Sequence, residues 1–287
     1  MPETEDDPSV RFWYRPFLFA PGGAAEAEDW VKELELATVT EMAKKDLEKT
    51  GERLKVLVLY GSLRHRSFSR LLAYEVCRIL WRLGCDVRVF DPEGLPMKDE
   101  RKHNHPLVQE LLSLSLWSDG HFWVSPEQHG NLTAVFKNQI DWIPLSTGSV
   151  RPTQGRTLGI AMVSGGSQSF NTVNSLRILG RWMRMFTIPN QSSVPQAYTL
   201  FTEESVEDEE NESGVSRMMA GPNRDRLVDC AEEFVKYTII MRQHVGLFGD
   251  RYSERSAADA KVTAAAAAEV PAPAASEKVN GVDLKKI

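Results

Sequence analysis

The segment Gly61–Arg70 places hydroxyl and guanidinium groups directly after the apolar run Val56–Tyr60. Its polar side chains are those of Ser62, Arg64, Arg66, Ser67, Ser69 and Arg70. The apolar run is short and partly β-branched, which predicts an inner strand of a parallel sheet, and Ser67 is a suitable N-cap for a helix that begins near Phe68. Free N–H groups at a helix start, flanked by guanidinium groups, suit a phosphate.

Two familiar kinds of phosphate loop do not match this segment. No Lys follows a second Gly, as a nucleoside-triphosphate loop requires, and there is no G-x-G-x-x-G for a pyrophosphate. We therefore interpret Gly61–Arg70 as a site for one terminal monophosphate. The alternative is an ordinary strand-to-helix turn with a serine cap and solvated arginines.

Two more loops rich in Gly, Ser and Pro follow apolar runs. His121–Val124 leads into Ser125–Gly130, and Leu158–Val163 leads into Ser164–Ser169. Strands that alternate with helices predict βαβ units, and hence an open parallel sheet with helices on both faces. Ligands bind such sheets at the carboxyl ends of the strands, so we expect the three loops to meet at one edge.

The hydrophobic pattern predicts five strands and six helices. The strands are Val56–Tyr60, Asp86–Phe90, His121–Val124, Leu158–Val163 and Thr187–Pro189. The helices are Glu28–Lys49, one from Phe68 to the residue before Gly84, Pro106–Trp117, Thr133–Trp142, Asn171–Met185 and Arg224–Phe248.

The chain is predicted to have three parts. Residues 1–50 form an N-terminal arm and helix, residues 51–249 the sheet domain, and residues 250–287 an Ala/Pro-rich tail that cannot bury a core and is expected to be disordered. Five aromatic residues between Phe12 and Phe19 suggest that the arm docks on a surface, such as a neighbouring subunit. The acidic stretch Glu203–Glu212 is interpreted as a solvated insertion.

Composition narrows the class of protein. The net charge is −6, and the sequence contains no basic stripe that would favour nucleic-acid binding. The acidic N-terminus is unlike a signal peptide, and no apolar run has membrane-spanning length, so a soluble, cytoplasmic protein without a membrane partner is expected. Three cysteines without paired spacing, Cys77, Cys85 and Cys230, argue against a disulfide framework or zinc site, and Cys77 is expected to be buried.

The motifs of the three loops resemble the NADPH-dependent FMN reductase family of flavodoxin-like proteins. The family pattern G-S-x-R-x-x-S stands at Gly61–Ser67, and P-E followed by K-N-x-I-D-W stands at Pro126-Glu127 and Lys137–Trp142. The arsenical-resistance subgroup of that family resembles this chain in SPExHGxxT, RPTQGRTL, SGGSQSFN and RWMRMFTIPNQSS, all between Ser125 and Ser193. The resemblance covers about residues 10 to 248.

The resemblance implies a flavodoxin-like sheet that binds FMN and uses NADPH as co-substrate. The FMN phosphate is expected at Ser62, Arg64, Ser67, Phe68 and Ser69, and the flavin ring at Ser125, Pro126, Glu127, Gln128, His129, Gly130, Ser164, Gly165, Gly166 and Ser167. Hydride passes to N5 of the flavin, so no protein group is predicted to be catalytic. Quinones, azo compounds, metal ions, oxygen and trivalent organoarsenicals are the implied substrates, and a homotetramer the implied assembly.

Some assignments have simpler alternatives. His129 and Glu127 could be surface loop residues. Asp141-Trp142 is expected to pack or to lie at a subunit interface. We interpret Arg181–Met185 as a helix end in preference to an NADPH-phosphate site. Gly165 is expected to allow either a close approach to the flavin or a positive φ. An electron carrier that serves a protein partner, or a flavoprotein with only a binding role, are the functional alternatives.

Overall fold

The structure is a computed structural model that describes residues 7–18, 29–146, 151–167, 169–202, 216–249 and 251–268. Phe19 of the predicted arm, the acidic stretch Glu203–Glu212 and the tail after residue 268 lie outside the described residues. The chain divides into two compact units, residues 1–246 and residues 247–287. The sheet and all the predicted site residues belong to the first unit.

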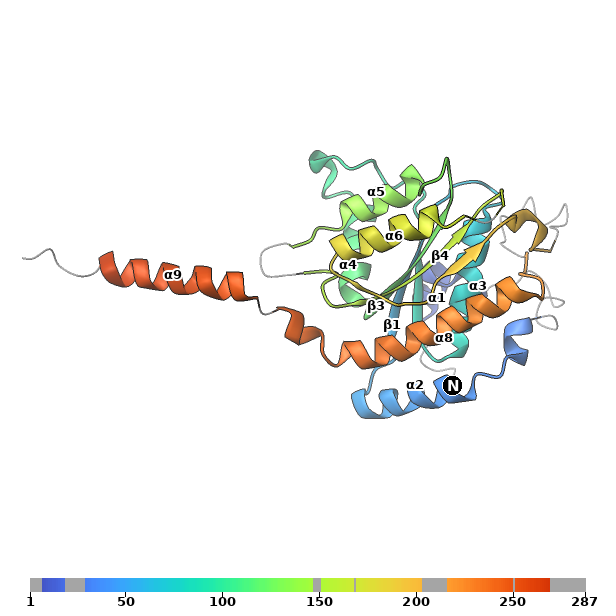
Figure 1. Cartoon of the computed structure of the whole chain (residues 1–287), viewed down its shortest axis with the longest axis horizontal. Helices are drawn as coiled ribbons and strands as arrows, with labels where there is room; N and C mark the ends of the chain where they lie inside the picture. The colour runs from blue at the N-terminus through green and yellow to red at the C-terminus, as the bar shows by residue number, and fades with distance from the viewer. Residues whose placement is uncertain are drawn as a thin grey trace, which may run out of the picture. The chain divides into compact units, whose positions relative to one another are not determined.

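A parallel sheet with the order β2-β1-β3-β4-β5 forms the centre of the first unit (Figure 1). Its strands are β1 (Lys55–Tyr60), β2 (Asp86–Phe90), β3 (Gly120–Pro126), β4 (Thr157–Val163), β5 (Phe186–Thr187) and β6 (Ser192–Val194). This 2-1-3-4-5 order is that of the flavodoxin-like doubly wound fold, as predicted.

The fifth position of the sheet is shared by two short strands. β5 pairs with the start of β4 and β6 pairs with its end, both in parallel. The sequence pattern predicts one strand, Thr187–Pro189. The ladder breaks because Pro189 has no N–H to donate, and Ser192–Val194, which the pattern missed, restores it near the end of β4.

Helices cover both faces of the sheet (Figure 1). α4 (Pro106–Trp117), α5 (Ala134–Trp142) and α6 (Asn171–Trp182) pack on one face, and α3 (Phe68–Arg82) and α8 (Pro222–Arg242) on the other, with α2 (Ala37–Thr50) against α8. Short 3-10 helices occupy Pro16–Leu18, Trp30–Glu33, Glu100–Lys102, Ala197–Thr199 and Val245–Gly249.

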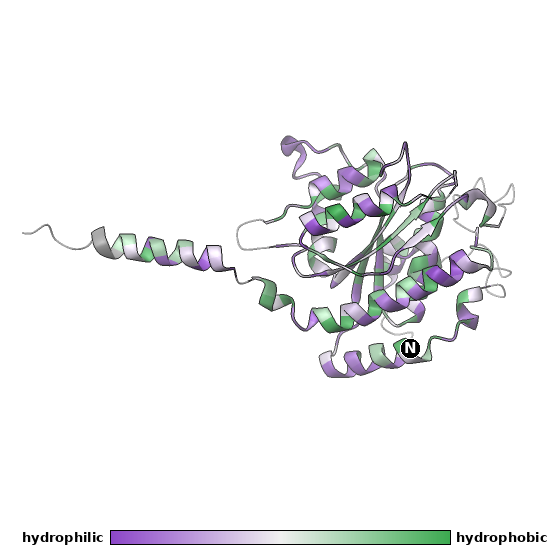
Figure 2. Cartoon of the chain, viewed as in Figure 1, coloured by the Kyte–Doolittle hydropathy of each residue, from purple (hydrophilic) through white to green (hydrophobic). Residues whose placement is uncertain are grey.

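The strand residues alternate between two buried clusters. Val56 and Val58 contribute to the cluster under α3 and α8, whereas Leu57 and Leu59 contribute to the one under α4, α5 and α6. Figure 2 shows the hydrophobic strands inside and hydrophilic residues on the outer sides of the helices. Burial on both faces explains why β1 reads as a continuous apolar run. Cys77 of α3 is fully buried, as predicted.

The N-terminal region differs from its prediction in two places. Pro8–Tyr14 forms a helix, α1, although its aromatic pattern suggested no regular element. The predicted helix Glu28–Lys49 is interrupted after Trp30–Glu33, and α2 begins only at Ala37. The interruption places Leu36 in the core at 5% exposure, which a continuous helix from Glu28 would orient differently.

The arm packs against its own chain. Arg15 donates to Val87 O at 3.2 Å, pairs with Asp86 at 2.6 Å and lies over the ring of Trp81, and Phe17 is buried. These contacts cover β2, the edge strand, which protects it from pairing with other chains.

The second unit contains α9 (Tyr252–Ala268), a helix where the composition predicted disorder. Its described side chains, residues 252 to 265, are exposed. An alanine-rich segment has high intrinsic helix propensity and needs no core to be helical, which is why the core-based argument missed it. No helix among the described residues combines the length and apolarity needed to cross a membrane.

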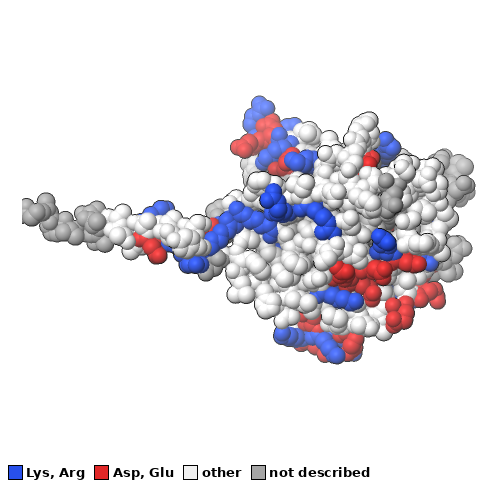
Figure 3. Space-filling model, in the orientation of Figure 1, with Lys and Arg blue, Asp and Glu red and all other residues white. Residues whose placement is uncertain are grey.

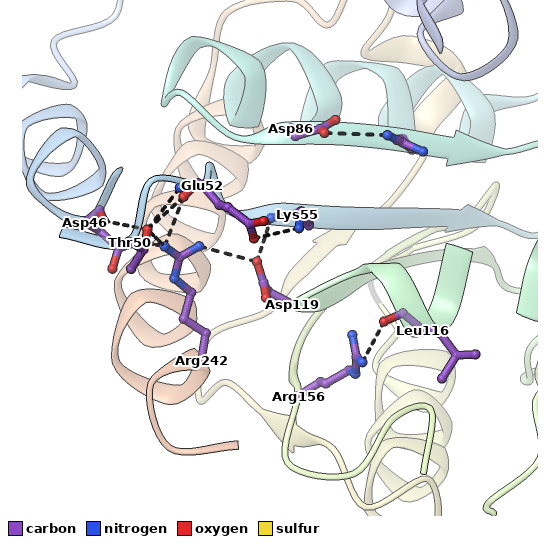
Figure 4. A network of polar contacts seen from close by, with 10 residues as sticks. Asp46, Thr50, Glu52, Lys55, Asp86, Leu116, Asp119, Arg156 and Arg242 are labelled. Carbon is purple, nitrogen blue, oxygen red and sulfur yellow. Dashed lines mark hydrogen bonds and ion pairs between the residues drawn. The ribbon is translucent and has the colours of Figure 1, made fainter. Parts of the chain in front are cut away.

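A network of charges lies at the amino edge of the sheet (Figure 4). Arg242 of α8 pairs with Asp46 of α2 at 2.6 Å and with Asp119, just before β3, at 3.5 Å, and it donates to Glu52 O at 3.0 Å. Asp119 in turn accepts from the N–H of Lys55 at 2.9 Å. The network ties α2 and α8 to the beginnings of β1 and β3.

Candidate active site

A cavity of about 270 Å³ opens at the carboxyl edge of the sheet, where the three predicted loops meet. Its lining consists of Ser62, Arg64, Arg66, Ser67, Phe68, Ser69, Pro126, Glu127, Gln128, Thr133, Val163, Ser164, Gly165, Ala197 and Tyr198. Ten of the fifteen predicted site residues are therefore brought together. The prediction that parallel strands gather these loops at one edge is confirmed by this arrangement.

A larger groove of about 740 Å³ lies elsewhere, beside α8. Asp229, Glu232 and Glu233 line it, and Figure 3 shows acidic side chains gathered over this helix. Negative carboxylates repel a phosphate, and the glycine and serine loops do not reach this groove. The smaller cavity is the better candidate for a phosphate-bearing ligand.

The first loop, Gly61–Arg70, is shaped by the start of α3. Ser67 caps the helix, since its Oγ accepts from Arg70 N at 3.1 Å, as predicted. The same Oγ lies 3.0 Å from Ser69 Oγ, and both serines are buried. The loop thus presents hydroxyls and a helix N-terminus to the cavity.

The three arginines of this loop have different contacts. Arg66 donates to Thr202 O at 2.9 Å and lies over the ring of Phe68, and Arg70 donates to His65 O. The guanidinium of Arg64 is exposed, lines the cavity and contacts no described residue. Arg64 is therefore the arginine of the loop that is available to a ligand.

Gly61 is required by packing rather than by backbone conformation. Its φ is not positive, and a Cβ there would lie 2.8 Å from Cβ of Phe136 and 2.9 Å from Oγ1 of Thr133. Thr133 Oγ1 donates to Gly61 O at 2.6 Å and also caps α5. The close approach of α5 to the end of β1 forms one wall of the cavity.

The second loop, Ser125–Gly130, reaches the cavity only in part. Pro126, Glu127 and Gln128 line it, but His129 and Gly130 form an exposed two-residue turn with φ values of 51° and 72°. The turn is closed by hydrogen bonds between Gln128 and Asn131, and two positive φ values are typical of a type I′ hairpin turn. His129 and Gly130 are exposed and are not part of the cavity lining.

Ser125 is also absent from the lining. Its side chain is buried at the end of β3, and its Oγ donates to Pro126 O at 3.0 Å. Successive residues inside a strand point to opposite faces of the sheet, so Ser125 and Pro126, the last two residues of β3, do not face the same way.

In the Ser164–Ser167 part of the third loop, carbonyl groups are hydrogen-bonded to the start of η5 (Ala197–Thr199), whereas several donors have no partner among the described residues. Ser164 O accepts from Ala197 N at 3.0 Å, and Gly166 O accepts from Gln196 N at 3.1 Å. The N–H groups of Gly165 and Gly166 have no acceptor among the described residues. Ser164 Oγ is buried and likewise has no partner there. Gly166 and Ser167 are exposed and do not line the cavity.

Gly165 resolves the two alternatives set out from the sequence. Its φ is not positive, so the conformational alternative is wrong. A Cβ at Gly165 meets no atom within 4 Å. The protein alone would accept alanine here, so only a ligand in the cavity could require the glycine.

The sequence prediction missed five lining residues: Arg66, Thr133, Val163, Ala197 and Tyr198. Arg66 was noticed for its charge, and Thr133 as a helix start, but neither was assigned to the site. Tyr198, 55% exposed, follows β6 and carried no motif signal. Tyr198 reaches the cavity because the N–H groups of Gln196 and Ala197 donate hydrogen bonds to the third loop.

Two other motifs lie away from the cavity. Arg181–Met185 ends α6 at the amino edge, where Thr153 Oγ1 donates to Met183 O at 2.7 Å and Gly155 N donates to Arg184 O at 2.9 Å. β4 separates this edge from the cavity by roughly 20 Å at about 3.3 Å per residue. Trp142 is buried and donates to Pro96 O, so it packs within its own chain.

The comparisons with known proteins agree with this geometry. The model of the family described as NADPH-dependent FMN reductase matches residues 54–199, which contain all three loops.

The chain belongs to the NADPH-dependent FMN reductase family.

Three similar proteins carry the name NADPH-dependent FMN reductase ArsH. The one from Rhizobium meliloti (strain 1021) is 54% identical over 210 residues, which is 73% of this chain and 83% of the relative. The one from Shigella flexneri is 52% identical over 206 residues, 71% of this chain and 76% of the relative. The one from Acidithiobacillus ferrooxidans is 51% identical over 201 residues, 70% of this chain and 80% of the relative.

This FMN reductase is therefore an oxidoreductase with FMN as cofactor and NADPH as co-substrate, and its similarity to ArsH proteins links it with arsenical resistance. The electron-carrier alternative does not account for that membership. The residues of the cavity fit the cofactor as well: Arg64 is available for a phosphate, Ser164 Oγ lacks a partner among the described residues, and no protein atom lies within 4 Å of a Cβ built at Gly165.

Proposed function

We propose that the cavity at the carboxyl edge holds FMN, with its phosphate at the first loop and its ring between the second and third loops. The observation that carries this assignment is the set of donors at one cavity that have no partner among the described residues: the Arg64 guanidinium, Ser164 Oγ and the N–H of Gly165. Ser164 Oγ is buried, and a buried donor without an acceptor costs free energy that a ligand with a matching acceptor removes. Arg64 and the Gly165 N–H are exposed and can bind the same ligand.

The protein groups in this proposal bind and orient. Bound FMN supplies the hydride and electron chemistry. The first loop anchors one end through charge-assisted hydrogen bonds. Donors of the third loop, aimed at the ring, favour negative charge there, which stabilises the reduced form. No side chain is assigned as an acid or base.

The second substrate is proposed to be a small acceptor such as a quinone, an azo compound, a metal ion or oxygen. For arsenical resistance, we propose oxidation of trivalent organoarsenicals to the pentavalent form. In that reaction the arsenic centre gains one oxygen from water and gives up two electrons, and two protons are released to solvent. NADPH is a second two-electron donor, so one arsenical and one NADPH together require two quinones, or two oxygen molecules reduced to peroxide, as final acceptors.

The chain's own thiols do not provide an arsenic site. Cys77, Cys85 and Cys230 are all free and buried. Burial raises the pKa of the Cys85 and Cys230 thiols to about 12, and that of Cys77 well above its usual value. Sulfur is a favourable ligand for a soft centre such as trivalent arsenic, but all three thiols of the chain are buried. An arsenical substrate is therefore proposed to meet the protein at the flavin cavity.

Anaerobic spectroscopy of the purified holoprotein tests this function. NADPH alone should bleach the flavin absorption, and admission of oxygen or a quinone should restore it. A trivalent organoarsenical added without NADPH should bleach the flavin if the arsenical donates its electrons there directly. Arsenical oxidation that occurs only with both NADPH and oxygen, and that catalase abolishes, would instead assign the reaction to released peroxide. Failure of NADPH to bleach the flavin would overturn the reductase assignment.

The homotetramer is proposed from the family resemblance, and the cytoplasmic location and the three-part division at residues 50 and 250 are proposed from the composition and pattern of the sequence. Phe12 and Trp13 of α1 are 65% and 71% exposed, so they are available to a subunit contact. Light scattering of Trp13→Ser should show a smaller assembly if α1 forms that contact, and an unchanged mass would remove α1 from it.

A further inference from the structure

Glu127 makes contacts at both ends of the third loop. Its backbone N–H donates to Val163 O, just before the loop, at 2.8 Å. Its carboxylate Oε2 accepts from Ser169 Oγ, at the end of the loop, at 2.7 Å and from Thr172 N, in the first turn of α6, at 3.4 Å. One residue of the second loop therefore spans the start and the finish of the third.

The start of α6 depends on this carboxylate. The N-cap residue Phe170 has no side-chain cap hydrogen bond, so α6 lacks a local cap. Asn171 N donates to Ser169 Oγ at 3.3 Å, and Ser169 Oγ donates on to Glu127. A carboxylate at a helix N-terminus satisfies free N–H groups and is favoured by the helix dipole. Glu127, from a distant segment, therefore provides the side-chain cap that Phe170 does not provide.

We propose that Glu127 is a positioning residue that clamps the second loop to the third and so sets the gap into which the flavin ring fits. The inference rests on the proposed function of the cavity. Glu127 lines that cavity together with Ser164 and Gly165, so a change in the clamp moves the donors of the third loop relative to the ring. The hydrogen bonds of the carboxylate, rather than its charge, perform this role.

Three variants separate hydrogen bonding from charge. Glu127→Ala removes both, Glu127→Gln keeps an oxygen that accepts from Ser169 and Thr172, and Ser169→Ala removes one donor and keeps the charge. FMN affinity should fall about tenfold or more in Glu127→Ala, stay within about threefold of wild type in Glu127→Gln, and fall by an intermediate factor in Ser169→Ala. Rescue by glutamine is the result that a role of the charge would not give.

Hydrogen exchange in the apoprotein tests the clamp without flavin. The Thr172 amide should exchange faster in Glu127→Ala and at the wild-type rate in Glu127→Gln. Thr238→Val is the matched control, since it removes the 2.6 Å hydrogen bond to Thr157 Oγ1 at the amino edge and lowers stability far from the loops. Thr238→Val should leave Thr172 exchange and FMN affinity unchanged.

Equal loss of FMN affinity in Glu127→Gln and Glu127→Ala would overturn the proposal, as would a loss in Glu127→Ala no larger than in Thr238→Val. If Glu127→Ala does not fold, Ser169→Ala decides, and unchanged exchange and affinity in that variant count against the clamp. Failure of the wild-type protein to bind FMN would refute the proposed function alone, because Thr172 exchange in the apoprotein still reports on the clamp.

Discussion

The two edges of the sheet use polar groups in opposite ways. At the amino edge, Arg242 is engaged by Asp46, Asp119 and the backbone of Glu52. At the carboxyl edge, Arg64 and Ser164 Oγ have no partner among the described residues. The first edge uses its charges to stabilise the fold, and the second keeps donors available. A variant should therefore affect stability at one edge and ligand affinity at the other.

Removing Arg242 should have the largest effect. Arg242→Met leaves the carboxylate of Asp46, 3% exposed, without its ion pair, which should lower the free energy of unfolding by about 3–5 kcal/mol. FMN affinity of the folded fraction should hardly change. Urea denaturation and fluorescence titration measure the two quantities. The double variant Asp46→Asn/Arg242→Met should recover part of the loss, and a single variant as stable as wild type would contradict the distinction between the edges.

Removing Arg64 should have the opposite signature. Arg64→Ala removes a charge-assisted contact to phosphate worth about 1.5–3 kcal/mol, so FMN affinity should fall roughly ten- to a hundredfold. The melting temperature of the apoprotein should not change, because the side chain is exposed and unpartnered among the described residues. Arg101→Ala, at an exposed surface arginine paired with Asp99, is the control. Wild-type FMN affinity in Arg64→Ala would remove the phosphate from this loop.

Acidification should weaken the fold from the amino edge. His121, fully buried near the start of β3, accepts from Trp123 Nε1 at 3.2 Å, and burial together with the charge of Arg156 lowers its pKa to about 3. The folded protein thus holds a neutral imidazole, while the unfolded chain binds a proton below about pH 6.5. The contribution of neutral His121 to the free energy of unfolding is complete above pH 6.5 and is lost as the pH falls towards 3.

The expected loss between pH 7 and pH 5 is about 2 kcal/mol of unfolding free energy, from about 1.4 kcal/mol per pH unit. Urea denaturation at the two values measures it, and His121→Gln should lack most of this pH dependence. An identical slope in wild type and variant would show that another group is responsible.

The smallest effect is expected at Gly165. Because a Cβ there meets no protein atom within 4 Å, Gly165→Ala should change apoprotein stability by less than about 0.5 kcal/mol. If the ring lies against the loop, FMN affinity should fall by about tenfold, which corresponds to about 1.4 kcal/mol. Melting of the apoprotein and titration with FMN together show whether the ring lies against this loop. A lower melting point with normal FMN affinity would place the ring elsewhere.

Much of the architecture could be predicted because local patterns carry it. The apolar runs predicted four strands nearly to their ends, and Ser67 was identified as the cap of α3. The broken fifth strand was missed because Ser192–Val194 is too short and polar to stand out. The arm helix α1 and the alanine-rich α9 were missed because neither contributes a clear amphipathic face.

The site was predicted by motif, which identifies segments but not the direction of each side chain. His129 and Gly130 belong to the second motif, yet they form an exposed turn with positive φ values and are not part of the cavity lining. Ser125 lies in the same motif and is buried in β3. Tyr198 belongs to none of the site motifs and lines the cavity. Contiguity in sequence therefore grouped residues of one loop that do not all line the cavity, and it overlooked η5.

By itself, the sequence determined the parallel sheet, the three polar strand ends and the edge at which they meet, because these follow from hydrophobic periodicity and from the handedness of βαβ connections. Only the tertiary structure decided which groups remain available. Arg66 is held by Thr202 whereas Arg64 is open, and Glu127 caps a helix that begins more than forty residues later. Such roles depend on distances between remote segments, which folding sets and no local pattern contains.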